Sequence, residues 1–362
     1  MSIAPHHPEP DSLAIEDGAG PSTVRLARLA MATRFEIVLH GENTASLRAA
    51  GEEALDEVER LEERLSLYRA SSEIAHLNAC AHLAPVRVTP ALFALLQHAR
   101  QLHDESGKAF DITAAPLVRC WGFMDENPRI PAPQELAGAR AKVGMHLVEL
   151  DPKNFTVRFA REGVMLDLGA IGKGYAIERA AELLREAGVT SALLHAGTST
   201  VYGLGSPSQA ESWKIAIPHP PISDALQDTG PGVAMERRSG GEFGAFAGVL
   251  ATVSLRDEAL SVSAVWGKCF RVGSNTFGHV LDPRTGEPAA AALLAAVVLP
   301  SAQETDALST ALLTRGAEGH EAIARLRPGM RTLLAVDRAG KLRVEARGFE
   351  VIPQELWDKK SN

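Results

Sequence analysis

The stretch from Leu166 to Gly205, LDLGAIGKGYAIERAAELLREAGVTSALLHAGTSTVYGLG, constrains the fold more than any other part of the sequence. Its pattern predicts a buried strand over 164–168, a glycine-rich turn, a helix to Ala187 and a second strand near 192–194. Glycines between a strand and a helix let the backbone approach a ligand, and the free N–H groups at a helix start suit phosphate. Lys173 adds a mobile cation there. A plain strand-to-helix turn with a surface lysine fits the same residues, so both interpretations stay open.

Composition narrows the possible partners. The chain has 362 residues, enough for two lobes or domains, and its net charge of −8 argues against nucleic acid or an anionic membrane surface. The three cysteines, Cys80, Cys120 and Cys269, lie far apart and show neither metal-ligand nor redox spacing. We see no membrane span, signal peptide or lipoprotein anchor, and therefore expect a cytoplasmic protein.

The order of the predicted elements indicates the fold class. Helices dominate the first half and a run of strands follows Val249, which favours an α+β fold over residues 23–350. Residues 1–22, rich in Pro, Gly, His and acidic residues, are expected to form a disordered leader. The Pro/Gly/Ser-rich span 218–248 is predicted to be a flexible loop, and 351–362 a C-terminal tail.

Two pairs of polar residues stand inside apolar segments. Asp111 and Thr113 either tie down a neighbouring loop or face a ligand, because buried polar side chains need partners. Asp306 and Thr310 lie four positions apart on a predicted helix and therefore share one face. A carboxylate and a hydroxyl there can offer two hard oxygen ligands to Mg²⁺. A helix cap or an internal hydrogen bond also explains this second pair.

Seven short motifs stand in a recognisable order along the chain. They are Met31-Ala32-Thr33, Leu65-Ser66-Leu67-Tyr68 with SSEIAHLN, FDITAAPLVRCWGF, LDLGAIGKGYAIE, the turn at Ala196-Gly197, GHVLDPRTGEP and ETDALSTALLTRG. In this order they resemble the ApbE family of FAD:protein FMN transferases, from Ala30 to about Gly316. Members attach FMN through a phosphoester bond to a threonine or serine of an acceptor protein. The resemblance implies two intimately packed lobes of mixed sheets and helices, with FAD in the cleft between them.

The resemblance also implies which positions bind FAD. Met31 and Tyr68 correspond to flavin contacts, and Asp111, Thr113 and Lys173 correspond to residues of the FAD cleft. These residue types agree with that use, since a lysine can neutralise phosphate charge and a buried carboxylate needs a partner.

Catalytic and metal roles follow from the same resemblance. It places Mg²⁺ on Asp306, Thr310 and the backbone carbonyl of Ala170, close to the FAD pyrophosphate, with Asp167 beside that site. His279 matches the second histidine of the family's HHIIDP-like motif, the proposed base, and also contacts the cofactor. Together with Lys173 and Asp167, His279 completes the predicted catalytic set.

The expected reaction is attack by an acceptor Thr or Ser hydroxyl on the FMN-side phosphorus of FAD, with AMP leaving. Mg²⁺ and Lys173 would stabilise the leaving charge. His279, with an ordinary pKa of about 6.5, would accept the hydroxyl proton. Attack by water at the same site would make the protein an FAD pyrophosphatase that yields FMN and AMP. A non-catalytic FAD-binding homologue is the third hypothesis.

Three places depart from the family pattern. Thr198 and Ser199 follow Gly197 where the family commonly has a GGD-type turn, so an acidic residue is missing. The TSG-like segment appears as SVSAV around Ala264, without its glycine, and Gly278 replaces the first histidine of the HH pair. These departures leave the predicted metal ligands in place and concern acceptor recognition and adenine-side binding.

Overall fold

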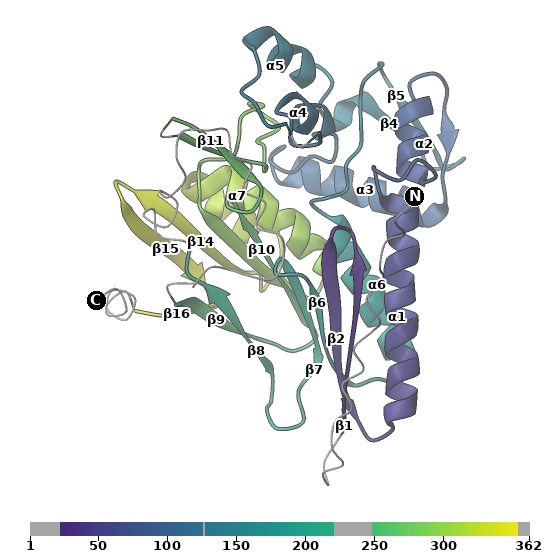
Figure 1. The fold of residues 1–362 in the computed structure, drawn as a ribbon, viewed down its shortest axis with the longest axis vertical. Coiled ribbons are helices and arrows are strands. Elements are labelled where there is room, and N and C mark those ends of the chain that lie inside the picture. The colour runs from purple at the N-terminus through teal and green to yellow at the C-terminus, as the bar shows by residue number, and fades with distance from the viewer. Residues whose placement is uncertain (1–21, 126, 221–247, 274, 354–362) are drawn as a thin grey trace, which may run out of the picture.

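The frame of the molecule is an eight-stranded antiparallel sheet (Figure 1), in a computed structural model that describes residues 22–125, 127–220, 248–273 and 275–353. Its strand order is β1-β2-β6-β7-β10-β13-β14-β15. The bounds are β1 (Ser22–Ala30), β2 (Thr33–Gly41), β6 (Ser191–Ala196), β7 (Thr200–Gly205), β10 (Glu258–Ala264), β13 (Leu294–Leu299), β14 (Arg331–Arg338) and β15 (Lys341–Arg347). Neighbours such as β7 and β10 are distant in sequence, so the sheet unites both halves of the chain.

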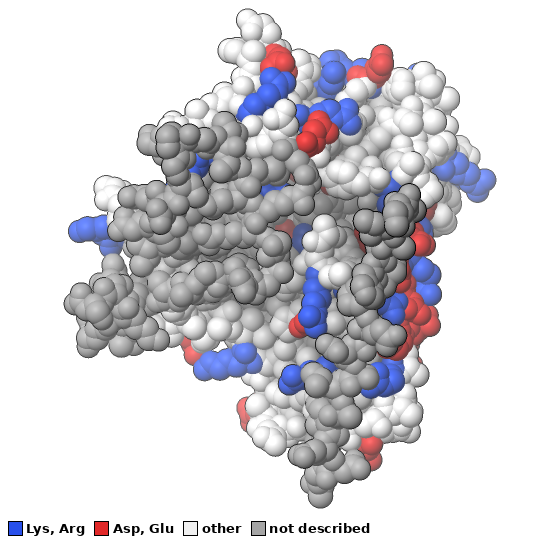
Figure 2. All heavy atoms as spheres, in the orientation of Figure 1, with Lys and Arg blue, Asp and Glu red and all other residues white. Residues whose placement is uncertain are grey.

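Three long helices pack on one face of this sheet: α1 (Thr44–Leu65), α6 (Gly172–Glu186) and α7 (Ala302–Ala324). Alternate residues of β2, including Phe35 and Leu39, enter the core that these helices share with the sheet. The outer side of α1 carries interspersed acidic and basic groups, as Figure 2 shows, and Arg28 of β1 pairs with Glu52 at 3.0 Å. The charged face is thus turned outward and the apolar face inward, as an amphipathic helix requires.

A second, three-stranded sheet of β8 (Trp213–Pro218), β9 (Val249–Leu255) and β16 (Glu350–Val351) forms another core on the main sheet. In β13, Ala295 and Val297 belong to the helix-side core, while Ala296 and Val298 belong to this second core. Successive side chains of a strand point to opposite faces. The uninterrupted apolar run of β13, predicted to be a central strand, is confirmed because both of its faces are covered.

A smaller aromatic core joins α4 (Ala115–Cys120) and α5 (Pro133–Arg140) to the hairpin β11 (Cys269–Val272) and β12 (Asn275–Gly278). The rings of Phe270 and Phe277 stack with centroids 5.3 Å apart, and Trp121 Nε1 donates to the carbonyl of Gly286 at 2.8 Å. The remaining elements are α2 (Glu73–Cys80), β3 (Val86–Arg87), α3 (Pro90–Glu105), the 3-10 turn η1 (Met145–Leu147), β4 (Val148–Asp151) and β5 (Thr156–Phe159). This aromatic core matters for function because His279 directly follows β12.

The α+β class is confirmed, and so are the helix and second strand predicted within 166–205, as α6 and β6. The strand predicted over 164–168 is wrong: the segment is extended and buried but pairs with no neighbouring strand. Instead, the Leu166 N–H and carbonyl bond the Asn78 side chain, and the Asp167 N–H donates to the Ile112 carbonyl. Buried peptide groups must be paired, and these partners meet that need without a sheet.

Several expectations concern residues that the structure does not describe. The proposed leader lies almost wholly outside the described residues, as do 221–247 of the predicted loop and 354–362 of the tail; Ser22 belongs to β1 and Val351 to β16. Within the described residues, no helix has the length and apolar character needed to cross a bilayer. The cytoplasmic location stays a prediction.

Candidate active site

The site is built where the first turn of α6 meets α7. The backbone N–H of Gly174 donates to Asp306 Oδ2 at 3.0 Å, across 132 residues of sequence. A Cβ at Gly174 would stand 2.2 Å from the carbonyl oxygen of Ala302 and 2.8 Å from Asp306 Cβ. Only glycine therefore allows this close approach, which aims a carboxylate at the positive end of the α6 dipole.

Lys173 brings a cation to the same junction. Its Nζ donates to the carbonyl of Gly169 at 2.9 Å and lies 3.8 Å from Asp306 Oδ1. The Asp306 side chain is only 5% exposed, so its charge needs compensation from groups fixed around it. At 3.8 Å the lysine compensates charge without making a direct hydrogen bond.

The predicted Mg²⁺ ligands meet at this junction in part. Thr310 Oγ1 lies one helical turn beyond Asp306 and donates to the Asp306 carbonyl at 3.2 Å, the internal hydrogen bond that the sequence also allowed. Ala170 lies two residues before α6 begins. A carboxylate, a hydroxyl and a carbonyl are hard oxygen donors of the kind that Mg²⁺ prefers.

The junction offers few protein ligands to a metal ion. Across the described residues, no group of three His, Cys, Asp or Glu side chains converges to hold a metal. An ion at Asp306 and Thr310 would therefore keep positions for water and phosphate, which is how Mg²⁺ usually binds in phosphoryl-transfer sites. The residues present fit that ion.

Asp167 is held in a fixed position beside the junction. Its Oδ1 accepts the Gly169 N–H at 2.8 Å, and its own N–H donates to the Ile112 carbonyl at 2.7 Å. Burial raises the pKa of Asp167, while the Gly169 hydrogen bond and the charges of Lys173 and Lys268 oppose that rise. A carboxyl group in such a setting is a candidate functional group.

Asn78 fixes the same segment from the other side. Its Oδ1 accepts from the Leu166 N–H at 2.7 Å and its Nδ2 donates to the Leu166 carbonyl at 3.0 Å. An amide side chain offers one donor and one acceptor in this spacing, so it replaces a neighbouring strand. The two residues are 88 positions apart, so no local pattern in the sequence indicates this contact.

His279 faces the site with a defined tautomer. Its Nδ1 lies 3.1 Å from the Lys268 carbonyl, which also accepts the His279 backbone N–H at 3.0 Å. Because a carbonyl can only accept, Nδ1 carries the proton and Nε2 keeps a lone pair. Burial, with the charges of Lys268 and Lys173, lowers the pKa of His279 to about 4, against the opposing hydrogen bond to the Lys268 carbonyl. The imidazole is therefore neutral near pH 7.

The predicted flavin contact Met31 stands at a strained turn. Met31 and Ala32 form the two-residue turn between β1 and β2, with φ values of 49° and 57°. Such turns usually contain Asn or Gly, because other side chains resist positive φ. Gly197 packs directly against the turn, since a Cβ there would lie 2.2 Å from Thr33 Oγ1. Strain of this kind is concentrated at functional sites, which agrees with a ligand contact here.

Tyr68, the other predicted flavin contact, lies between α1 and α2 with 70% of its surface exposed. Partial burial, together with the negative charges of Asp167 and Asp125, raises the pKa of Tyr68. The electrostatic influence of Asp167 places the phenol near the catalytic cluster. Such an exposed aromatic side chain is available to stack on a planar ligand.

Asp111 and Thr113 make the loop-tying contacts that the sequence allowed. Asp111 Oδ1 accepts from the Thr113 hydroxyl at 2.6 Å, and Thr113 Oγ1 accepts the Gly144 N–H at 2.6 Å. His103 Nδ1 lies 3.3 Å from Asp111 Oδ2. Burial raises the pKa of Asp111, against the charge of His103 and the Thr113 hydrogen bonds. These bonds stabilise the loop that contains Ile112, whose carbonyl accepts the Asp167 N–H. A direct role of Asp111 and Thr113 in the FAD cleft stays a prediction.

The structure thus places Asp306 beside Lys173 and Thr310, and the charge of Lys173 acts on both Asp167 and His279, which puts these two residues in the same region. Sequence reasoning missed Lys268, whose charge acts on both Asp167 and His279. The only available signal was a lysine three residues beyond the TSG-like segment, which is too common a feature to single out.

The departure at Gly278 has a steric explanation. A Cβ at this position would lie 2.7 Å from the Val265 carbonyl oxygen, so no side chain fits without a shift of the backbone. This chain therefore closes the position of the first histidine by backbone packing.

The turn at Gly197, where the family pattern has an acidic residue, has a φ of 58°. The Val262 N–H of β10 donates to the Ser199 carbonyl of this turn at 2.7 Å.

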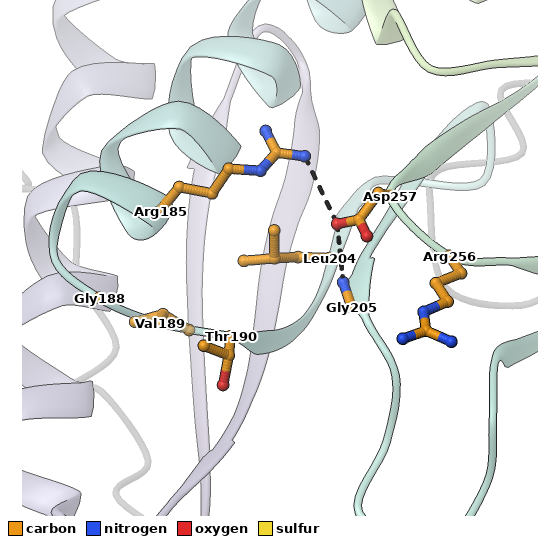
Figure 3. Close-up of a pocket in the computed structure, with 8 residues that line it drawn as sticks. All are labelled: Arg185, Gly188, Val189, Thr190, Leu204, Gly205, Arg256 and Asp257. Atoms are coloured by element: carbon orange, nitrogen blue, oxygen red, sulfur yellow. Dashed lines mark hydrogen bonds and ion pairs between the residues drawn. The ribbon is translucent and has the colours of Figure 1, made fainter.

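Two open hollows on the surface differ in which of these residues they adjoin. One, of about 380 Å³, is bounded by Leu67, Asn78 and Met165, next to Tyr68 and the Asp167 segment. The other, of about 410 Å³, lies at the far end of α6 between Arg185 and Asp257 (Figure 3).

The geometry defines an α+β protein in which the start of α6 meets a buried carboxylate beside a lysine, and comparison with known proteins places it more closely. The ApbE family profile matches residues 31–334, and the chain belongs to the ApbE family.

Individual relatives support that assignment. A FAD:protein FMN transferase of Treponema pallidum is 29% identical over 322 residues, covering 85% of this chain and 83% of the relative. One of Salmonella typhimurium is 27% identical with the same coverage. The crystal structure of an ApbE protein from Thermotoga maritima is 25% identical, with a TM-score of 0.75 over 89% of this chain and 96% of that one. A flavinyl transferase of Pseudomonas stutzeri, 23% identical with a TM-score of 0.74 over 91% and 96%, has the same fold.

Proposed function

We propose that this protein is a transferase that moves FMN from FAD to a Thr or Ser hydroxyl of an acceptor protein and releases AMP, with Mg²⁺ as its metal. The observation that carries the proposal is the junction at which Gly174 and Lys173 meet the buried carboxylate of Asp306, with a neutral His279 nearby. The names of the relatives indicate FAD as the substrate, and the junction contains groups suited to binding its phosphates.

His279 suits removal of the acceptor proton. The Lys268 carbonyl holds the Nδ1 proton, so Nε2 is left to accept a proton from the attacking hydroxyl. A pKa of about 4 keeps the imidazole neutral at physiological pH, although it makes the ring a weak base. Bound phosphate would raise that pKa, because a nearby negative charge favours the protonated form.

The start of α6 and Lys173 suit the pyrophosphate. Backbone N–H groups at a helix start bind phosphate oxygens, and Lys173 Nζ can leave the Gly169 carbonyl to neutralise charge on AMP as it departs. A Mg²⁺ ion held there would supply further neutralisation of the pyrophosphate charge. Asp306 and Thr310 are the side chains that would hold it, with the Ala170 carbonyl as the third donor.

FAD pyrophosphatase activity is the second candidate. The same residues can activate water, and the departures at Thr198, Ser199, Ala264 and Gly278 concern the parts that would recognise an acceptor. Hydrolysis and transfer differ only in the nucleophile that attacks the FMN-side phosphorus. A non-catalytic FAD-binding protein is the remaining alternative.

One experiment separates these functions. The full chain is incubated with FAD, Mg²⁺ and a peptide or domain that carries an Asp-x-x-(Ser/Thr)-(Gly/Ala)-Ala-Thr-like acceptor, while AMP is quantified and flavin fluorescence is followed on a denaturing gel. AMP with a labelled acceptor supports transfer, and AMP with no label supports hydrolysis. FAD binding without AMP contradicts both enzymatic proposals. An acceptor with the flavinylated residue changed to Ala and a reaction with excess chelator serve as controls.

A further inference from the structure

A row of buried and half-buried hydroxyl groups joins β10 to α7 and includes the proposed metal ligand Thr310. Ser261 and Ser263 are two positions apart on β10, so their side chains project from the same face of the strand, toward α7. Ser261 Oγ lies 2.9 Å from Thr305 Oγ1, and Ser263 Oγ lies 2.9 Å from Ser309 Oγ. Ser263 Oγ also lies 3.2 Å from Thr310 Oγ1. One serine of this pair therefore touches a proposed ligand.

The number of hydroxyl protons shows which groups donate and which accept in the hydrogen bonds of Ser263. Thr310 Oγ1 donates to the Asp306 carbonyl at 3.2 Å, and Ser309 Oγ donates to the same carbonyl at 3.0 Å. A hydroxyl has one proton and two lone pairs, so both groups act as acceptors toward β10. Ser263 has a single proton, so it is a shared donor to Ser309 at 2.9 Å and Thr310 at 3.2 Å, and the Thr310 oxygen keeps a further lone pair.

The rotamer of Thr310 is the quantity that this contact can control. A threonine in a helix divides between two χ1 rotamers, because its hydroxyl can bond the carbonyl one turn earlier. A second partner on β10 favours the rotamer that keeps Oγ1 near both Ser263 and the Asp306 carbonyl. Without Ser263, the choice rests on the 3.2 Å internal bond alone.

We infer that Ser263 is a positioning residue that orients the Thr310 hydroxyl so that a lone pair is available to a divalent cation at Asp306. This inference rests on the proposed function, because the ion and its ligands belong to that proposal. Ser263 acts through Thr310 and does not itself touch the ion or FAD. This role explains why the SVSAV segment retains the Ser263 hydroxyl although it lacks the glycine of the family pattern.

Ser261 supplies a matched control. It lies on the same strand and face and bonds an α7 hydroxyl at the same 2.9 Å as the Ser263–Ser309 contact, while it is more deeply buried and also lies 3.1 Å from Thr200 Oγ1 of β7. Its partner Thr305 donates to the Ala302 carbonyl and is not a proposed ligand. Loss of the Ser261 hydroxyl should affect packing between β10 and α7 without affecting the ligand.

The test compares the full-length wild type with Ser263→Ala, Ser261→Ala and the conservative Ser263→Thr. Mn²⁺ binding is measured by the loss of the free-ion electron paramagnetic resonance signal, with FAD absent and present, and the Mg²⁺ dependence of AMP release is measured in parallel. Thermal unfolding without metal reports packing. We expect Ser263→Ala to weaken Mn²⁺ binding, and to raise the half-saturating Mg²⁺ concentration, by about tenfold, as is usual when a residue that orients a ligand is lost. Ser261→Ala should stay within about twofold, and Ser263→Thr should restore most of the loss.

The outcomes separate this inference from the proposed function. Equal Mn²⁺ binding by Ser263→Ala and Ser261→Ala overturns the role of Ser263, whatever the enzyme does. A wild type that binds Mn²⁺ but releases no AMP overturns the proposed function, while weaker Mn²⁺ binding by Ser263→Ala still supports its positioning role. A wild type that binds no Mn²⁺ in either condition overturns both.

Discussion

The two ends of α6 differ in how they hold charge. At its start, the N–H of Gly174 meets the buried carboxylate of Asp306 at 3.0 Å, and a cation stands beside it. At its end, Arg185 reaches across a wide hollow to Asp257 at 3.7 Å, and both side chains are largely exposed (Figure 3). One helix thus carries a closed polar junction at one end and an open ion pair at the other.

The contrast shows that an open hollow such as the one at the end of α6 is not by itself a guide to chemistry. Exposed ion pairs are screened by water and contribute little, so Arg185 and Asp257 need no functional explanation. A buried carboxylate costs free energy unless donors and cations are fixed around it, and such sites are where function concentrates. The predictions below test that difference between the two ends of the helix.

The largest effect is expected for Asp306→Asn. The amide oxygen can still accept the Gly174 N–H, so the helix junction should form, but the negative charge that would bind Mg²⁺ is lost. AMP release from FAD should fall about 10³-fold. Circular dichroism and thermal unfolding check the fold, and Asp257→Asn at the other end is the matched control. Retained activity in Asp306→Asn would contradict the metal assignment.

A second effect concerns the pH dependence of His279. Because its folded pKa of about 4 lies below an ordinary value of about 6.5, the imidazole is the base form throughout the neutral range. The acid limb of kcat/KM for AMP release should therefore fall well below pH 6.5, toward pH 4. His279→Gln should slow the reaction about 10²-fold and remove that limb.

The same shift has a consequence for stability. Between about pH 6.5 and 4 the unfolded chain binds a proton at His279 that the folded chain does not, so stability falls as the pH falls through this window. Denaturant unfolding at pH 7 and pH 5 should show a smaller loss for His279→Gln than for the wild type. An equal loss in both proteins would count against the lowered pKa.

The sequence predicted the parts of this site that depend on local pattern. Helical spacing located α6 and put Asp306 and Thr310 on one face, and the ordered motifs indicated the family. It could not predict the contacts that join distant segments, such as Gly174 to Asp306 or Asn78 to Leu166. An apolar run at 164–168 looks the same whether its backbone partner is a strand or an amide side chain, which is why a strand was predicted there.

A third prediction compares two glycines of the same helix region. Gly174→Ala places a Cβ 2.2 Å from the Ala302 carbonyl, so α6 and α7 must separate. Overpacking should cost about 3 kcal/mol of unfolding free energy and disturb Asp306, with a matching loss of AMP release. Gly188→Ala has open space around it but a φ of 81°, which should cost about 1 kcal/mol and leave activity unchanged. Denaturant unfolding and AMP assays on both variants measure the difference; equal effects on activity would show that the close contact at Gly174 is not needed.

The smallest effect is expected for Arg185→Met at the open end. Methionine keeps the aliphatic stem and removes the guanidinium, which contacts the Tyr202 hydroxyl and lies 3.7 Å from Asp257. Both charged side chains are exposed to solvent, so the free energy of unfolding should change by no more than about 1 kcal/mol. The Asp257 carboxylate still accepts the Gly205 N–H at 3.1 Å, and the turn between the strands keeps that bond. AMP release should match the wild type, and a double-mutant cycle with Asp257→Asn isolates the ion pair. A large loss of activity would mean that the open end of α6 takes part in catalysis and that burial of charge does not distinguish its two ends.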